Sequence, residues 1–176
     1  VLSSGRGDEF ASEDMILAMR ELLLPQTTII TPNSIEARRL VQDEMEDSDE
    51  LDLEQCGERI LHMGCEYVLI TGAHENTRQV TNTLYTGSGV VRSDVWQRLT
   101  GSYHGSGCTL ASAIAATIAN GLPVSDGVYE AQEYTWQALK SGFHPGMGQY
   151  LPDRLFWARN EHDSKEEDEL DVEPKD

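Results

Sequence analysis

Basic residues are scarce in this sequence of 176 residues, which has 13 lysines and arginines against 31 aspartates and glutamates. The formal net charge is −18 at pH 7, and a chain this acidic is repelled by nucleic acid and by anionic lipid. Eight carboxylates lie between Asp43 and Glu54, and nine lie between Glu161 and Asp176. We interpret these runs as solvated loop and tail, and we expect neither nucleic acid nor a membrane as a partner.

Cysteine and long apolar runs are also lacking. Three cysteines cannot all pair, and no Cys-x-x-Cys motif is present, so we expect reduced thiols and a cytoplasmic protein. No apolar run reaches the length of about 18 residues that a membrane-spanning helix needs. No basic start with an apolar core indicates a signal peptide. The sequence begins at Val1 without a methionine, and we expect it to be part of a longer protein.

Missing motifs exclude several enzyme classes. The sequence has no Gly-x-x-x-x-Gly-Lys-Ser/Thr, which excludes a P-loop, and no Gly-x-Ser-x-Gly, which excludes the nucleophile elbow of the hydrolases. His104 precedes Cys108 by four residues, but no thiol-protease signature surrounds this cysteine.

Apolar periodicity predicts alternating helices and strands within one layered α/β domain. A strand followed by a helix and a second strand indicates a parallel βαβ unit, and a Gly-Ser-Gly turn between two later strands indicates a hairpin. The expected helices are 13–24, 35–41, 51–64, a helix that ends near 120 and a helix that starts at Pro123, and the expected strands are 27–31, 67–71, 80–86 and 90–96.

The segment Gly105-Ser106-Gly107-Cys108 joins a glycine loop to a helix start. Glycine lets the backbone lie close against an anion, and the first N–H groups of a helix attract negative charge. We therefore interpret this segment as a phosphate cradle with a reactive thiol at the helix start. The alternatives are a tight turn and, for Cys108, a small buried apolar residue.

Two more segments follow predicted strands, at the edge of a parallel sheet where ligands bind. Residues 33–36 follow the strand 27–31. Residues 71–74 begin at the last residue of the strand 67–71. Without further information, Asn33 and Glu36 equally suit a helix cap with its capping box, and His74 and His104 suit hydrogen bonding within loops.

Together these three segments resemble motifs of the ribokinase-like kinases, and within them the hydroxymethylpyrimidine/phosphomethylpyrimidine kinases of thiamine biosynthesis. Residues 31–36 are similar to that family's Thr-Pro-Asn-x-x-Glu, and residues 104–110 are similar to His-Gly-Thr-Gly-Cys-Thr-Leu. Residues 68–74 resemble Val-Leu-Val-Lys-Gly-Gly-His. The resemblance spans roughly residues 1–139. It implies a ribokinase-like layered fold with a mainly parallel sheet flanked by helices, of which the N-terminal part is missing.

The resemblance implies ATP-dependent phosphorylation of hydroxymethylpyrimidine and of its monophosphate, with ATP and Mg²⁺ as cofactors. Cys108 is then the catalytic base, or the group that positions the acceptor oxygen. Gly105, Ser106 and Gly107 form the anion hole with it, and Asn33 and Glu36 hold the metal mostly through water. Nucleotide contacts are implied for Thr71, Gly72, His74 and His104.

Three departures keep other readings open. Thr71 stands where the family usually has lysine, Ser102-Tyr103 replaces the usual Asn-Thr before the cradle, and the residues that recognise the pyrimidine usually lie before the matched part. A pyridoxal or pyridoxine kinase and a non-catalytic remnant are the alternatives. We expect residues 1–158 to form the C-terminal portion of a kinase domain, 159–176 to form a disordered acidic tail, and a homodimer to be among the states in solution, because an open sheet edge favours self-association.

Overall fold

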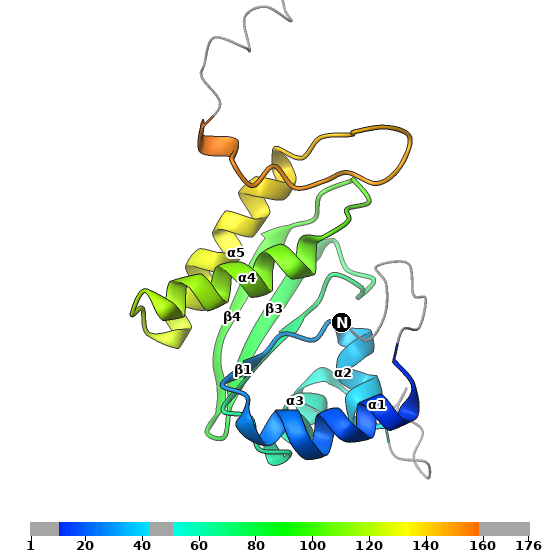
Figure 1. The fold of residues 1–176 in the computed structure, drawn as a ribbon, viewed down its shortest axis with the longest axis vertical. Helices are drawn as coiled ribbons and strands as arrows, with labels where there is room; N and C mark the ends of the chain where they lie inside the picture. The colour runs from blue at the N-terminus through cyan, green and yellow to red at the C-terminus, as the bar shows by residue number, and fades with distance from the viewer. Residues whose placement is uncertain (1–10, 43–50, 159–176) are drawn as a thin grey trace, which may run out of the picture.

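A computed structural model describes residues 11–42 and 51–158 of the chain. The described residues form an α/β fold in which helices cover both faces of a four-stranded sheet (Figure 1). The expected loop at 43–50 and the expected tail at 159–176 lie outside the described residues.

Side chains cap most of the helices at the N-terminus. Ser12 caps the first helix, and Asn33 and Asp52 each form a capping box with the residue three positions later. The α-helices are α1 (Glu13–Ala18), α2 (Ser34–Val41), α3 (Leu53–His62), α4 (Ser106–Ala119) and α5 (Val124–Lys140).

The expected helix at 13–24 is α-helical only in its first half. After Ala18 it widens into a π-helix, η1 (Met19–Leu23), and then tightens into a 3₁₀ turn, η2 (Leu24–Gln26), which contains Pro25. Proline removes a backbone donor, so the α-helical hydrogen bonding does not continue past this point.

The sheet has the order β1-β2-β3-β4, with bounds β1 (Ile29–Ile30), β2 (Tyr67–Thr71), β3 (Gln79–Thr86) and β4 (Gly89–Gln97). β1 and β2 run parallel, as the predicted βαβ unit requires, and β2, β3 and β4 follow as antiparallel neighbours. The described sheet is thus mixed rather than mainly parallel, because the expected hairpin supplies half of its strands.

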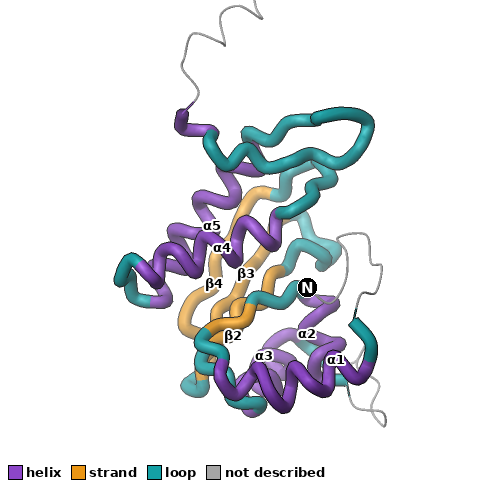
Figure 2. Tube along the Cα trace, in the orientation of Figure 1, coloured by secondary structure: helices purple, strands orange, loops and turns teal. Residues whose placement is uncertain are grey.

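β2 sends alternate side chains to two separate cores. Val68 and Ile70 pack with α1, α2 and α3 on one face, while Leu69 between them packs with α4 and α5 on the other. The side chains of β3 alternate in the same way, with Tyr85 on the first face and Leu84 on the second. Figure 2 shows the resulting layers, with helices on either side of the strands. This three-layer arrangement explains why β2 is apolar at successive positions.

The chain after α5 returns across the segment that precedes α4 (Figure 1). Tyr150 and Tyr103 form an isolated parallel bridge, and His104 N donates to Tyr150 O at 2.9 Å. A short 3₁₀ turn, η4 (Phe156–Ala158), ends the described residues, and the rings of Phe156 and Trp157 lie 6.0 and 5.8 Å from that of Tyr134 on α5. The C-terminal segment is therefore docked on α5 beside the start of α4.

Candidate functional site

The strand register brings the predicted segments to one edge of the sheet. Asn33 lies opposite Thr71 in an isolated parallel bridge, and Thr71 pairs with Asn82 on β3. Gln79 at the start of β3 pairs with Gln97 at the end of β4, and the cradle follows β4. The ends of β1, β2 and β4 thus share the edge at which α/β folds bind ligands.

Asn33 and Glu36 form the capping box that starts α2. Glu36 N donates to Asn33 Oδ1 at 2.9 Å, and Asn33 N donates to Glu36 Oε2 at 3.1 Å. The interpretation of Asn33 and Glu36 as a helix cap with its capping box is thus confirmed by their contacts. A carboxylate and an amide oxygen together offer several further lone pairs, so the same pair has the oxygen donors that suit a hydrated Mg²⁺. No group of three or more His, Cys, Asp or Glu residues within 11–42 and 51–158 is arranged to hold a metal.

Gly72 begins a tightly held loop between β2 and β3. Its N–H donates to Asn82 Oδ1 at 3.1 Å, and a Cβ at this position would lie 2.3 Å from the carbonyl oxygen of Thr81. Only glycine fits so close to a neighbouring backbone. The exposed His74 lies in the same loop.

Arg98 holds this loop from the segment that follows β4. Its guanidinium donates to the carbonyl oxygens of Ala73, Glu75 and Thr77 at 2.7, 2.9 and 2.9 Å. Arg98 therefore connects the candidate nucleotide loop to the segment that leads into the cradle.

Glu75 connects the same loop to α2. Its Oε1 lies 3.0 Å from Arg38 Nη1, and the hydrogen bond from Arg38, followed by the influence of the Ser34 hydroxyl, lowers the pKa of the Glu75 carboxyl. The loop at 72–77 is thus attached both to the helix that carries Glu36 and to the segment before the cradle.

The cradle residues start α4 without a side-chain cap. Gly105 is the N-cap and adopts a left-handed conformation with φ of 83°, which favours glycine. A Cβ on Gly107 would meet nothing within 4 Å, so space remains open beside the first turn. Cys108 is exposed, which excludes the alternative of a buried apolar residue.

The other two cysteines belong to the core. Cys56 and Cys65 are buried, and burial raises the pKa of both thiols. Cys108 is thus the one accessible thiol among the three cysteines of the chain.

A buried polar network behind Gly72 was not predicted. Asn82 Nδ2 donates to Gln132 Oε1 at 2.8 Å, and Gln132 Nε2 donates to Asp94 Oδ2 at 2.9 Å. Asp94 in turn accepts two hydrogen bonds of 2.8 Å from Arg92. A signal existed in the sequence, because Gln132 interrupts the apolar face of α5 that Val128 and Ala131 begin.

Arg154 was also missed by sequence reasoning. Its Nε donates to Thr109 Oγ1 at 3.1 Å, and its Nη2 lies 3.1 Å from the position of a Cβ on Gly105. Nothing in the local sequence indicates this contact, since 45 residues separate Arg154 from Thr109. The structure thus adds a cation to the side of the cradle.

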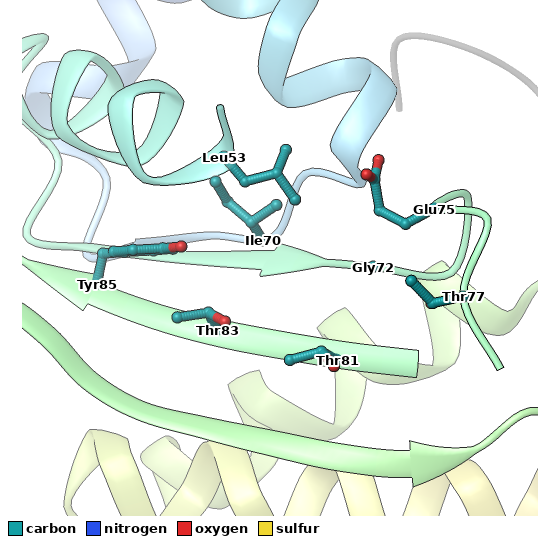
Figure 3. A pocket seen from close by; sticks show the side chains of 8 residues that line it. All are labelled: Leu53, Ile70, Gly72, Glu75, Thr77, Thr81, Thr83 and Tyr85. Carbon is teal, nitrogen blue, oxygen red and sulfur yellow. The ribbon is translucent and has the colours of Figure 1, made fainter. Parts of the chain in front are cut away.

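A shallow pocket of about 150 Å³ lies on the opposite face of the sheet from α4 (Figure 3). Leu53 of α3 and Ile70 of β2 meet at one wall, and Thr83 and Tyr85 lie along β3. Glu75 and Gly72 contribute its other end, so the pocket adjoins the held loop rather than the cradle.

In the part of the chain that the structure describes, no helix has the length and apolarity needed to cross a membrane.

Comparisons with known proteins identify the family and the fold of this chain. Residues 1–153 match the family described as phosphomethylpyrimidine kinase. The hydroxymethylpyrimidine/phosphomethylpyrimidine kinase of Rhizobium meliloti is 32% identical over 149 residues, which cover 85% of this chain and 56% of the relative. The pyridoxine kinase of Bacillus subtilis is 35% identical, with 76% of this chain and 49% of the relative covered. The chain spans about half the length of these curated relatives.

Among solved structures, the ADP complex of Bacillus subtilis pyridoxal kinase has a TM-score of 0.75 to this chain. The two chains are 29% identical, and the match covers 85% of this chain and 58% of the pyridoxal kinase chain. The ribokinase-like α/β fold expected from the sequence is thus confirmed. Given the family match over residues 1–153, this chain belongs to the phosphomethylpyrimidine kinase family.

Proposed function

We propose that the protein carrying this chain transfers the γ-phosphoryl group of ATP to hydroxymethylpyrimidine, and then phosphorylates the resulting monophosphate, in thiamine biosynthesis. The observation that carries the proposal is the convergence of the cradle, the Asn33–Glu36 turn and the Gly72 loop at one sheet edge. Phosphoryl transfer needs fixed electrostatic donors more than covalent chemistry, and this edge offers them.

In this proposal the cradle binds the transferred group. The N–H groups of Gly105, Ser106, Gly107 and Cys108 surround its oxygens, and they need no reorganisation because the helix holds them. The alcohol oxygen forms the new bond to phosphorus while the bond to the ADP oxygen breaks. Cys108, exposed beside the cradle, accepts the alcohol proton or positions the alcohol oxygen.

Asn33 and Glu36 are proposed to hold Mg²⁺ mostly through water. A bound magnesium ion would neutralise charge on the phosphate oxygens. The capping box keeps both side chains oriented at the carboxyl end of β1, where both are half-buried.

Thr71, Gly72, His74 and His104 are proposed to contact the nucleotide. Arg98 and Asn82 support this assignment, because their hydrogen bonds keep the Gly72 loop in one shape before any ligand binds. We further propose that residues 1–158 are the C-terminal portion of the kinase domain, that the protein acts in the cytoplasm and that it forms a homodimer.

The direct test is turnover by the full-length protein that carries this chain. With ATP and Mg²⁺, we expect ADP to form only when hydroxymethylpyrimidine or its monophosphate is added. Phosphate-free acceptor analogues that lack the hydroxymethyl group serve as controls. Absence of turnover with either acceptor would refute this proposal and leave the pyridoxine or pyridoxal kinase and the non-catalytic remnant as alternatives.

A pyridoxine or pyridoxal kinase is the second candidate function. It is favoured by the identity of 35% to the Bacillus subtilis pyridoxine kinase and by the likeness to the pyridoxal kinase structure. The two acceptors share an aromatic ring with a hydroxymethyl group, so the cradle alone suits both. Comparing kcat/KM for the two alcohols side by side decides between them.

A further inference from the structure

Arg154 is held in place beside the start of α4 by its backbone. Asp153 N donates to Ala138 O at 2.8 Å, and Tyr134 Oη donates to Arg154 O at 3.1 Å, which fixes this part of the chain on α5. From there the guanidinium reaches Thr109 Oγ1 at 3.1 Å. The hydroxyl of Thr109 itself donates to Gly105 O at 2.8 Å, so Arg154 is linked to the N-cap of the cradle.

The exposed guanidinium of Arg154 has fewer protein partners than those of Arg20, Arg38, Arg39, Arg92 and Arg98. Arg38, Arg39 and Arg92 each contact a carboxylate. Arg20 and Arg98 each donate to three backbone carbonyls. Within the described residues, the side chain of Arg154 has a single hydrogen bond, and its acceptor is a neutral hydroxyl. Most of the five N–H donors of its guanidinium are therefore available to a ligand.

Its position also opposes the usual electrostatics of helices. The N-terminus of a helix carries partial positive charge and attracts anions, while cations favour the C-terminus. Arg154 lies against Gly105 at the N-terminus of α4, whose first turn contains no acidic residue. An anion bound between the exposed guanidinium and the helix N-terminus would be attracted by both, so the arrangement suits an anionic ligand.

We propose that Arg154 is a catalytic residue of this kinase, which contacts the phosphoryl group that is transferred. The inference rests on the proposed function, because that function supplies the anion. A guanidinium matches phosphate geometry and stabilises the negative charge that spreads over the equatorial oxygens in the transition state. Arg154 lies one position beyond the 153 residues that match the family, so the family match does not assign it this role.

The test compares binding of AMP-PCP and ADP by the full-length protein and its Arg154→Gln variant, using calorimetry. Because a hydrogen bond to a charged group contributes about 10- to 100-fold in affinity, we expect AMP-PCP affinity to fall by that factor and ADP affinity by less than about 3-fold. Arg154→Lys keeps the charge without the planar fork and should give an intermediate loss. Arg59→Gln on α3 makes the same change of charge in the opposite layer and should alter neither affinity.

Unchanged AMP-PCP binding in Arg154→Gln would overturn the assignment, and so would equal losses for AMP-PCP and ADP. A lower melting temperature with unchanged relative affinities would mean that Arg154 only clamps the C-terminal segment. If Arg154→Gln does not fold, the same comparison with Arg154→Lys decides. A wild-type protein that binds AMP-PCP but phosphorylates neither alcohol would refute the proposed function and leave the Arg154 contact standing. One that binds no AMP-PCP would refute both.

Discussion

At the scale of single residues, Gly105 and Gly107 differ in what a side chain would do. Gly105 has φ of 83°, where a Cβ strains the backbone and approaches Arg154. Gly107 lies within α4, and a Cβ there meets nothing within 4 Å. The first glycine therefore serves the backbone of the turn, and the second leaves open space beside the first turn of α4.

The two alanine substitutions should separate these roles. Gly105→Ala should lower the free energy of unfolding by about 1 to 2 kcal/mol, the cost of a left-handed conformation for a residue with a Cβ. Gly107→Ala should leave stability unchanged or raise it by up to about 1 kcal/mol, yet weaken AMP-PCP binding because its methyl group enters the cradle. Urea titration and calorimetry measure the two effects. If neither variant bound AMP-PCP more weakly than the wild type, the cradle would not be part of the phosphate site.

Cys108 has the most specific chemical role in the proposed function. If it accepts the alcohol proton, Cys108→Ala should lower the single-turnover rate by about 100-fold or more, while nucleotide affinity changes little. Cys108→Ser is the matched control, because it keeps a polar atom at the position without the acidity of a thiol. Rapid-quench measurement of phosphoryl transfer gives the rate. Equal losses in rate and in nucleotide affinity would instead indicate a structural thiol.

Glu75 predicts a dependence of stability on pH. Arg38 and Ser34 lower its pKa in the folded protein below the ordinary value of 4.5. Its contribution is therefore complete above pH 4.5 and is lost as the pH falls through the lower folded pKa. Because the Glu75 side chain is 34% exposed, solvent screening keeps the contribution below about 1 kcal/mol.

Glu75→Gln should accordingly be less stable than the wild type at pH 7 and should match it more closely at pH 3. Urea titrations at both pH values measure this difference. The exposed Glu66 supplies the control, since Glu66→Gln should show no such convergence. A Glu75→Gln variant that is as stable as the wild type at pH 7 would show that the ion pair with Arg38 contributes nothing.

At the scale of elements, a buried network joins α5 to the sheet. Gln132 accepts from Asn82 on β3 and from Trp96 Nε1 on β4, and donates to Asp94 on β4. Gln132 is 3% exposed, and its partners Asn82 and Asp94 are also buried, so little water reaches these groups. Because Asn82 also accepts from Gly72 N, the packing of α5 is connected to the shape of the candidate nucleotide loop.

Gln132→Leu should therefore destabilise the fold, since it leaves Asn82, Asp94 and Trp96 without their shared partner. We expect a loss of about 2 to 4 kcal/mol, because each orphaned buried polar group costs about 1 to 3 kcal/mol. The half-buried Gln137 on the same helix offers a matched control, and Gln137→Leu should change stability by less than about 0.5 kcal/mol. Chemical denaturation followed by circular dichroism measures both. Equal losses in the two variants would mean that the network adds no stability.

At the scale of the whole molecule, the described sheet has two unequal edges. β1 is only two residues long, whereas β4 extends over nine residues and pairs with β3 alone among the described strands. β4 exposes apolar side chains, with Val90 at 53% and Val95 at 55%. A long edge strand with exposed valines favours pairing between chains.

If β4 contributes to the proposed homodimer, Val95→Lys should shift the protein toward the monomer while leaving its unfolding free energy within about 0.5 kcal/mol. Val95→Thr keeps the β-branched shape without the charge and should preserve the dimer. Analytical ultracentrifugation over a range of concentrations measures both. A dimer that persists unchanged in Val95→Lys would place the interface elsewhere.

The sequence by itself determined the family and most of the elements. Three short motifs carried the resemblance, and strand β2 occurs at the predicted residues 67–71 because a run of five apolar and β-branched residues leaves little alternative. The hairpin of β3 and β4 followed from its Gly-Ser-Gly turn. Local chemistry was sufficient in these places, since the controlling residues are neighbours in the chain. The change from α- to π-helix after Ala18 was not predicted, because both helices show nearly the same periodicity.

The contacts between distant residues follow from the packing of the fold. The register of the strands placed Asn33 beside Thr71, and the return of the chain after α5 brought Arg154 against Gly105. Arg98 and Gln132 likewise act through partners more than 20 residues away. Such contacts depend on how strands pair and helices pack, so periodicity and spacing carry no record of them. The motifs therefore identified the kinase family, whereas the packed fold determined which cation lies beside the cradle.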